Sequence, residues 1–217
     1  MDTIVGRLEQ VYGRPILTKR KAAIDELVLT ILSQNTNDQN RDRAFRRLKE
    51  RFPTWEAVKN ADVIQIEEAI RPGGLARTKA PRIKKALHAI ENRCGELSLD
   101  LLEQRSTEEA FAFLTSLDGV GPKTAACVLL FAFDKPVFPV DTHIWRIAKR
   151  LGIVDEKTSA EKTQSVLQKL VAPADYYSFH LNLIRHGRSV CYARRPNCPE
   201  CVLVDVCRYY AKENADV

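Results

Sequence analysis

Hydrophobic positions recur with a helical period along almost the whole chain. In segment 24–32 the apolar residues follow the spacing of one helix face, at Ile24, Leu27, Val28, Ile31 and Leu32. The same spacing predicts helices over 38–52, 62–70, 79–93 and 122–133. No segment alternates between apolar and polar residues over more than a few positions, so strands are not expected. The pattern therefore predicts an all-α fold.

Capping signals predict where several of these helices begin. Ser106 and Glu109 fit a capping box that opens a helix running to about Leu117. Pro122 suits the first position of the helix that reaches Phe133. Further helix starts are expected at the capping residues Thr54, Asp141, Ser159 and Asp175.

Composition limits the class of protein without deciding its function. The 217 residues include 34 Lys and Arg against 28 Asp and Glu, a net charge of +6 that is compatible with a polyanionic partner. The longest apolar run, 125–133, is nine residues, against the roughly 20 needed to span a bilayer. The N-terminus shows no secretion signal. We expect a cytoplasmic protein with no membrane partner.

Four of the six cysteines crowd into the last part of the chain, at Cys191, Cys198, Cys201 and Cys207. In a chain without export signals such clustering indicates a metal site rather than disulfides. Four thiolates hold either zinc or an iron–sulfur cluster. One short C-x2-C pair flanked by two distant single cysteines differs from the paired knuckles of zinc ribbons and favours the cluster. Cys94 and Cys127 lie in helical apolar patterns and are expected to be buried.

A glycine-rich turn between two helices is a candidate phosphate site. Gly119 and Gly121 permit a tight turn that exposes backbone N–H groups, while Val120 points back into the core. A helix N-terminus follows at once, which suits a DNA phosphate; the alternative is an ordinary interhelical turn. Lys123 lies in the first turn of that helix, where the positive helix end favours a neutral, nucleophilic amine. The alternative for Lys123 is a salt bridge to phosphate.

Asp141, in the segment 140–143, has two compatible interpretations. It is a favoured residue type for a helix N-cap. A carboxylate held at a helix N-terminus also stays ionised and fixed in direction, as a catalytic group requires.

Together these features resemble the endonuclease III branch of the helix-hairpin-helix (HhH-GPD) DNA glycosylases. The matching segments are 117–126, 140–146 and 186–188, the last leading into the cysteine pattern. The resemblance implies two helical domains flanking a DNA-binding cleft. One is a six-helix barrel, residues 17–135, with the helix-hairpin-helix motif at about 109–133. The other joins residues 1–16 to 136–217 and carries a [4Fe–4S] cluster in loop 191–207.

The resemblance also implies a chemistry and a set of contacts. Lys123 would attack C1′ of a damaged nucleoside, and Asp141 would assist departure of the base. The enzyme would be a monomeric, bifunctional DNA glycosylase and abasic-site lyase acting on oxidised pyrimidines in duplex DNA. The expected DNA-binding residues are Gln34, Asn35, Leu75, Gly119, Val120, Gly121, His143, Arg194 and Arg195.

The chain departs from the family pattern at several positions beside the DNA. Leu75 matches one wedge that fills the gap left by the extruded base, but Asn35 occupies the usual glutamine slot of the other wedge and Gln34 precedes it. Either of the two could fill the gap. Asp118, Ala76 and Pro122 also replace commoner residues, which leaves the lesion preference open.

Two other functions are compatible with parts of this pattern. One is a mismatch or adenine glycosylase on the same scaffold, against which Lys123 argues. The other is a non-enzymatic iron–sulfur DNA-binding sensor, which would not require both Lys123 and Asp141.

Overall fold

The structure is a computed structural model that describes residues 1–213; the last four positions of the predicted second domain, 214–217, lie outside the described residues. Every regular element within 1–213 is a helix, and this part of the chain contains no strand, which confirms the predicted all-α fold. The chain divides into two compact units: Lys19–Lys135, here the middle domain, and Met1–Thr18 with Pro136–Val217, here the terminal domain.

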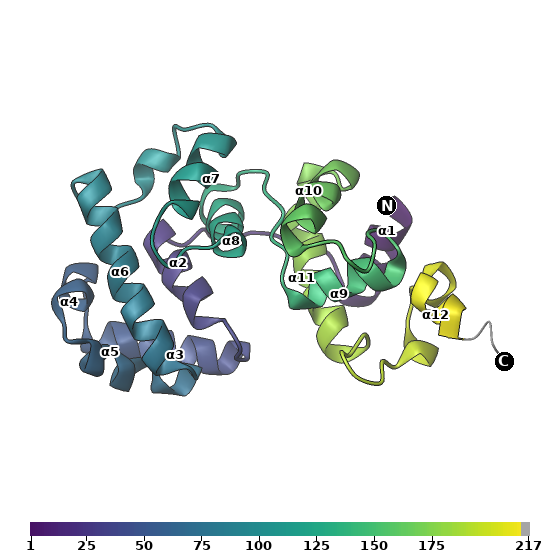
Figure 1. Ribbon diagram of the computed structural model, residues 1–217, viewed down its shortest axis with the longest axis horizontal. Coiled ribbons are helices and arrows are strands. Elements are labelled where there is room, and N and C mark those ends of the chain that lie inside the picture. The colour runs from purple at the N-terminus through teal and green to yellow at the C-terminus, as the bar shows by residue number, and fades with distance from the viewer. Residues whose placement is uncertain (214–217) are drawn as a thin grey trace. The chain divides into compact units, whose positions relative to one another are not determined.

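The middle domain is built around the apolar helix α2. Eight of its ten residues are buried, and it packs against α8, α3 and α6 (Figure 1). The helices of this domain are α2 (Ala23–Leu32), α3 (Asp38–Arg51), α4 (Trp55–Asn60), α5 (Val63–Ile70), α6 (Ala76–Cys94), α7 (Thr107–Thr115) and α8 (Pro122–Phe133), with short 3-10 turns at Arg71–Gly73 and Asp100–Leu102.

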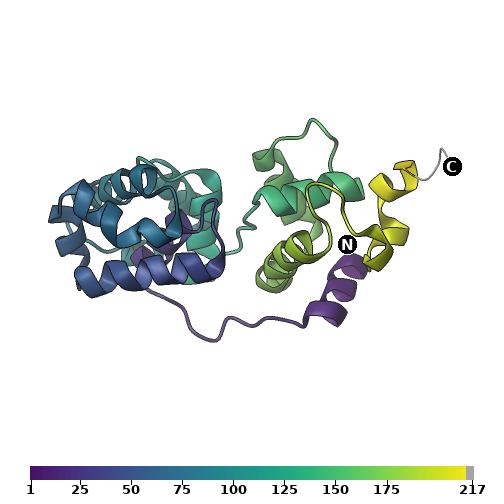
Figure 2. The ribbon, with the colours of Figure 1, turned by 90° about the horizontal axis from the view of Figure 1, so that it is seen from below.

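In the terminal domain, α11 is the central helix and packs against both α1 and α9. In its core the ring of Phe138 packs edge-on against Tyr176 and at a tilt against Phe179. Figure 2 shows the purple α1 beside the yellow C-terminal segment, and Arg7 pairs there with Asp205. The helices are α1 (Asp2–Tyr12), α9 (Thr142–Leu151), α10 (Ala160–Leu170), α11 (Tyr176–Ser189) and α12 (Arg208–Glu213), with 3-10 turns at Pro173–Asp175, Cys198–Glu200 and Val204–Val206.

Most of the predicted helix starts are observed. The Ser106–Glu109 capping box is present, Pro122 is the first residue of α8, and Thr54 and Ser159 accept hydrogen bonds as N-caps. None of the helices in residues 1–213 is both long and apolar enough to cross a bilayer.

Three details of the prediction were wrong. The helix expected from Lys79 begins three residues earlier, at Ala76. Its N-cap is Leu75, an unusual residue type for a cap, and the backbone of Leu75 is in the left-handed conformation. The helix expected to reach Leu117 ends at Thr115, since the carbonyl of Leu117 is used by the following turn. Cys94 is half-buried rather than buried.

Candidate active site

The glycine-rich turn joins α7 to α8 in the middle domain. The carbonyl of Leu117 accepts a hydrogen bond from the N–H of Val120 at 3.1 Å, and Gly119 has φ +86°. This is a type II turn, which needs a positive φ at its third residue and so favours glycine there. Val120 is buried as expected. The turn leaves Gly121 as the N-cap of α8.

Lys123 is the second residue of α8 and is half-buried. It lies close enough to Glu26 of α2 to affect that carboxyl group. Burial raises the pKa of Glu26, while Lys21, the hydroxyl of Thr30, Arg41 and Lys123 each act to lower it. The candidate nucleophile therefore stands at the end of the helix that packs on α2.

Asp141 is the N-cap of α9 in the terminal domain. Its Oδ1 accepts hydrogen bonds from the backbone N–H groups of His143 and Ile144, both at 2.9 Å. These bonds fix the direction of a half-buried carboxylate. The adjacent His143 is held by the side chain of Arg146, 3.1 Å from its Nδ1, and by close packing against Gly187.

Three of the expected DNA contacts have a strained backbone. Only four non-glycine residues in 1–213 have positive φ, and they include Asn35 (+50°), Leu75 (+50°) and Arg195 (+51°). Such conformations are unfavourable for L-residues, and they cluster at functional sites. Leu75 is 53% exposed, unusual for a large apolar side chain. Arg194 and Arg195 are both exposed in the cysteine loop.

The two neighbouring residues 34 and 35 differ in their surroundings. The side-chain carbonyl of Gln34 accepts a hydrogen bond from Arg82 at 3.0 Å, and Gln34 is half-buried. Asn35 is exposed. Gln34 is thus held against α6, whereas Asn35 is presented to solvent.

The four clustered thiols lie within one loop and influence one another. Burial, together with Cys207 and Cys191, raises the pKa of Cys198. Burial, together with Cys191, Cys207 and Cys198, raises the pKa of Cys201. Within residues 1–213 no three His, Cys, Asp or Glu side chains are grouped as a metal site requires. The effect of these thiols on one another's pKa shows that they lie near each other.

Side chains from other elements surround this loop. Arg150 of α9 donates to Cys191 Sγ at 3.2 Å and to the carbonyl of Tyr192 at 2.7 Å. His186 Nε2 lies 3.4 Å from Cys201 Sγ, and its Nδ1 lies 3.1 Å from the hydroxyl of Tyr12. Burial lowers the pKa of His186 to about 4. In the sequence, the spacing of four residues between Arg146 and Arg150 places both on one face of a helix, and this was the signal that could have identified Arg150.

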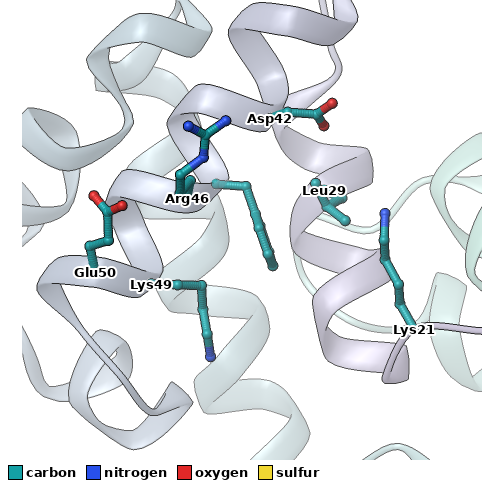
Figure 3. Close-up of a pocket in the computed structure, with 7 residues that line it drawn as sticks. Lys21, Leu29, Asp42, Arg46, Lys49 and Glu50 are labelled. Atoms are coloured by element: carbon teal, nitrogen blue, oxygen red, sulfur yellow. The ribbon is translucent and has the colours of Figure 1, made fainter.

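A cavity of about 490 Å³ lies apart from these residues, on the middle domain. Figure 3 shows Leu29 and Lys21 on one side and α3 side chains on the other, including Asp42, Arg46 and Lys49. Its lining includes none of the candidate catalytic or DNA-binding residues.

Comparison with known proteins gives a consistent set of relatives. The family model for the "HhH-GPD superfamily base excision DNA repair protein" matches residues 28–173. Endonuclease III of Sulfolobus acidocaldarius is 36% identical over 197 residues, 90% of this chain and 86% of that protein. A protein of Arabidopsis thaliana that bears the name of a DNA glycosylase is 44% identical over 173 residues, 79% of this chain; the match spans 58% of that longer protein.

Solved structures of endonuclease III match along almost the whole chain. A trapped covalent intermediate of endonuclease III with DNA is 28% identical, has a TM-score of 0.81, and covers 96% of this chain and 94% of its own. A non-covalent endonuclease III–DNA complex is 28% identical, has a TM-score of 0.82, and covers 98% and 95%.

Proposed function

The chain belongs to the HhH-GPD superfamily of base excision DNA repair proteins, and we propose that it is a bifunctional member that releases oxidised pyrimidines from duplex DNA and cuts the abasic strand. Membership makes it a DNA glycosylase of base excision repair. The lesion class and the lyase step form the proposal. Its main support is the position of Lys123, at the second residue of α8 directly after the hairpin turn.

The proposed reaction starts with the neutral amine of Lys123. Its nitrogen bonds to C1′ as the bond from C1′ to the base breaks, and the base leaves with the electron pair and takes up a proton. The sugar becomes positively charged in this step, and the carboxylate of Asp141 stabilises that charge.

The lysine adduct then accounts for strand cutting. The amine nitrogen loses its proton, the sugar ring opens as O4′ takes up a proton, and an iminium ion joins Lys123 to C1′. Loss of a proton from C2′ expels the 3′ phosphate, which is β-elimination. Water finally releases the lysine. The related endonuclease III structure trapped as a covalent intermediate with DNA supports this route.

The flipped nucleotide leaves a gap in the base stack. We assign its filling to Leu75 and Asn35, both exposed and both on a strained backbone. Gln34 is assigned a supporting role because Arg82 holds its side chain. Gly119, Val120 and Gly121 of the hairpin, with Arg194 and Arg195, would bind the phosphate backbone, and His143 would contact DNA beside Asp141.

We further propose that Cys191, Cys198, Cys201 and Cys207 hold a [4Fe–4S] cluster. The fit rests on the donor set: four half-buried thiols in one loop that affect one another's pKa. The cluster would hold the loop rigid, so that Arg194 and Arg195 are presented to phosphate. We also propose that the enzyme works as a monomer, in the cytoplasm at the chromosome.

Borohydride trapping tests the proposed nucleophile. Reduction in the presence of abasic-site DNA should give a covalent complex with the wild-type protein and none with Lys123→Gln. Lys85→Gln is the matched control, because Lys85 is an exposed amine beside the hairpin that pairs with Asp118 at 3.4 Å. A complex that persists in Lys123→Gln would overturn the assignment. Duplexes that each carry one lesion, assayed for free base, test the substrate class; release restricted to mismatched or undamaged bases would refute it.

A further inference from the structure

Lys79 is among the largest side chains fully buried in residues 1–213, with 1% of its surface exposed. Lysine is among the residues least often buried, because an ammonium group loses its hydration there. No ion pair of the described residues includes Lys79. It takes a position on α6 that an apolar residue would fill, in line with Ile83 and Ile90.

The amine of Lys79 joins two separate segments. Its Nζ donates to the carbonyl of Leu32 at 2.7 Å and to the carbonyl of Gly73 at 2.8 Å. Leu32 is the last residue of α2, so its carbonyl lacks a partner within the helix. Asn35 follows Leu32 by three residues, and Leu75 follows Gly73 by two. One buried amine therefore holds the starts of both loops that carry the assigned wedges.

The surroundings leave these segments little freedom. A Cβ built on Gly73 would lie 3.0 Å from the Cβ of Ala44, so the turn already touches α3. One helical turn beyond Lys79, Arg82 binds the side chain of Gln34 and packs beneath Gly119 of the hairpin. Helix α6 thus contacts all three segments of the middle domain that are expected to meet DNA.

We propose that Lys79 is a positioning residue, whose amine fixes the spacing between the Asn35 and Leu75 loops so that both enter the base stack together. It acts through the loops and does not touch the sugar, because its amine is shielded from solvent. This inference rests on the proposed function, since it presumes that these loops fill the gap in DNA.

The test compares one abasic site in two settings. The first is a continuous duplex, where extrusion leaves a gap opposite a stacked base. The second is a bubble of unpaired nucleotides, where little stacking has to be disrupted. Rates of borohydride-trapped complex formation are measured for the wild type, Lys79→Met and Lys84→Met. Lys84 is the matched control: it lies on the same helix and donates to one backbone carbonyl, that of Ala61, at 2.6 Å.

Lys79→Met should lose roughly tenfold to a hundredfold in rate on the duplex; a hundredfold is the loss that a misplacement of about 1 Å can cause. It should keep most of its rate on the bubble. Lys84→Met should keep both rates. In addition, 2-aminopurine placed opposite the abasic site should change its fluorescence on binding the wild type and much less on binding Lys79→Met.

Equal rate losses for Lys79→Met on both substrates, or no loss on either, would overturn the inference. If Lys79→Met does not fold, Lys79→Arg replaces it, since the guanidinium keeps donors but cannot reproduce the geometry of the amine. Equal rate losses of Lys79→Arg on the two substrates, relative to the wild type, would again refute the inference. Failure of the proposed function is distinguishable, because the wild type itself would then give no trapped complex.

Discussion

Gly187 of α11 offers a sharp test of how the helix that carries Asp141 is seated. A Cβ built at Gly187 would lie 2.8 Å from the Cβ of His143 and 2.9 Å from its Nδ1. Both Cβ atoms are attached directly to helix backbones, so a rotamer change cannot relieve the contact. In Gly187→Ala, α9 and α11 would have to separate.

The net effect combines two opposed contributions. Overpacking of this kind costs about 1–3 kcal/mol, and a contact between two backbone-attached atoms belongs near the upper end. Alanine is favoured over glycine within a helix by about 1 kcal/mol. We therefore expect Gly187→Ala to lower the free energy of unfolding of the terminal domain by about 2 kcal/mol. With a urea dependence near 2 kcal/mol per molar, the midpoint should fall by about 1 M.

Each domain contains one of the two tryptophans, so the assay can be made specific to a domain. In a Trp55→Phe background the fluorescence of Trp145 reports on the terminal domain, where the midpoint should fall. In a Trp145→Phe background Trp55 reports on the middle domain, whose midpoint should not move. Gly6→Ala is the control: nothing lies within 4 Å of its added Cβ, so the terminal domain should gain about 1 kcal/mol.

A function assay follows from the same geometry. The N–H of His143 is one of the two groups that hold Asp141 Oδ1. Displacing His143 should slow base release by about tenfold. An unchanged or higher urea midpoint for Gly187→Ala would refute the reasoning, because it would mean that α9 is not seated against Gly187. The double variant His143→Gly/Gly187→Ala should recover stability relative to the sum of the single variants.

Three further predictions concern Asp141, Lys79 and the cysteines. Asp141→Ala should lose the N-cap and about 1 kcal/mol of terminal-domain stability, whereas Asp141→Asn should keep the cap and lose base release. Urea unfolding measures the first effect and single-turnover assays the second. Normal base release by Asp141→Asn would show that Asp141 serves only as a cap. Burial lowers the pKa of Lys79 to about 8 in the folded protein, below its ordinary 10.5, so the unfolded chain binds this proton more tightly. The stability of the wild type relative to Lys79→Met should therefore rise by up to about 3 kcal/mol between pH 8 and 10.5. Equal slopes of stability against pH for the two proteins would contradict this. Cys198→Ser should reduce the iron bound per chain and the visible absorption while Cys127→Ser leaves both unchanged, as measured by iron analysis and spectroscopy; a colourless wild type that contains one zinc would refute the cluster.

The amino-acid sequence determined the local part of this structure. The all-α fold follows from the helical period of the apolar residues, because that period alone decides which face of each segment can be buried. Helix starts at Ser106 and Asp141 follow from side chains that bond to backbone groups only two or three residues away, and the start at Pro122 follows from the fixed φ of proline, which suits the first helical position. The type II turn at Gly119 likewise depends on one residue's freedom to adopt a positive φ.

Tertiary structure decided whatever depends on partners distant in the chain. The sequence around Lys79 indicates an ordinary surface lysine. Its buried amine is evident only from the contact with the carbonyl of Leu32, 47 residues away. Arg150 reaches Cys191 over 41 residues, and Tyr12 reaches His186 over 174. Burial, and with it the lowered pKa values of Lys79 and His186, arises only when separate helices close around a side chain. No periodicity encodes those contacts, because the residues that exclude water from such a group belong to other elements.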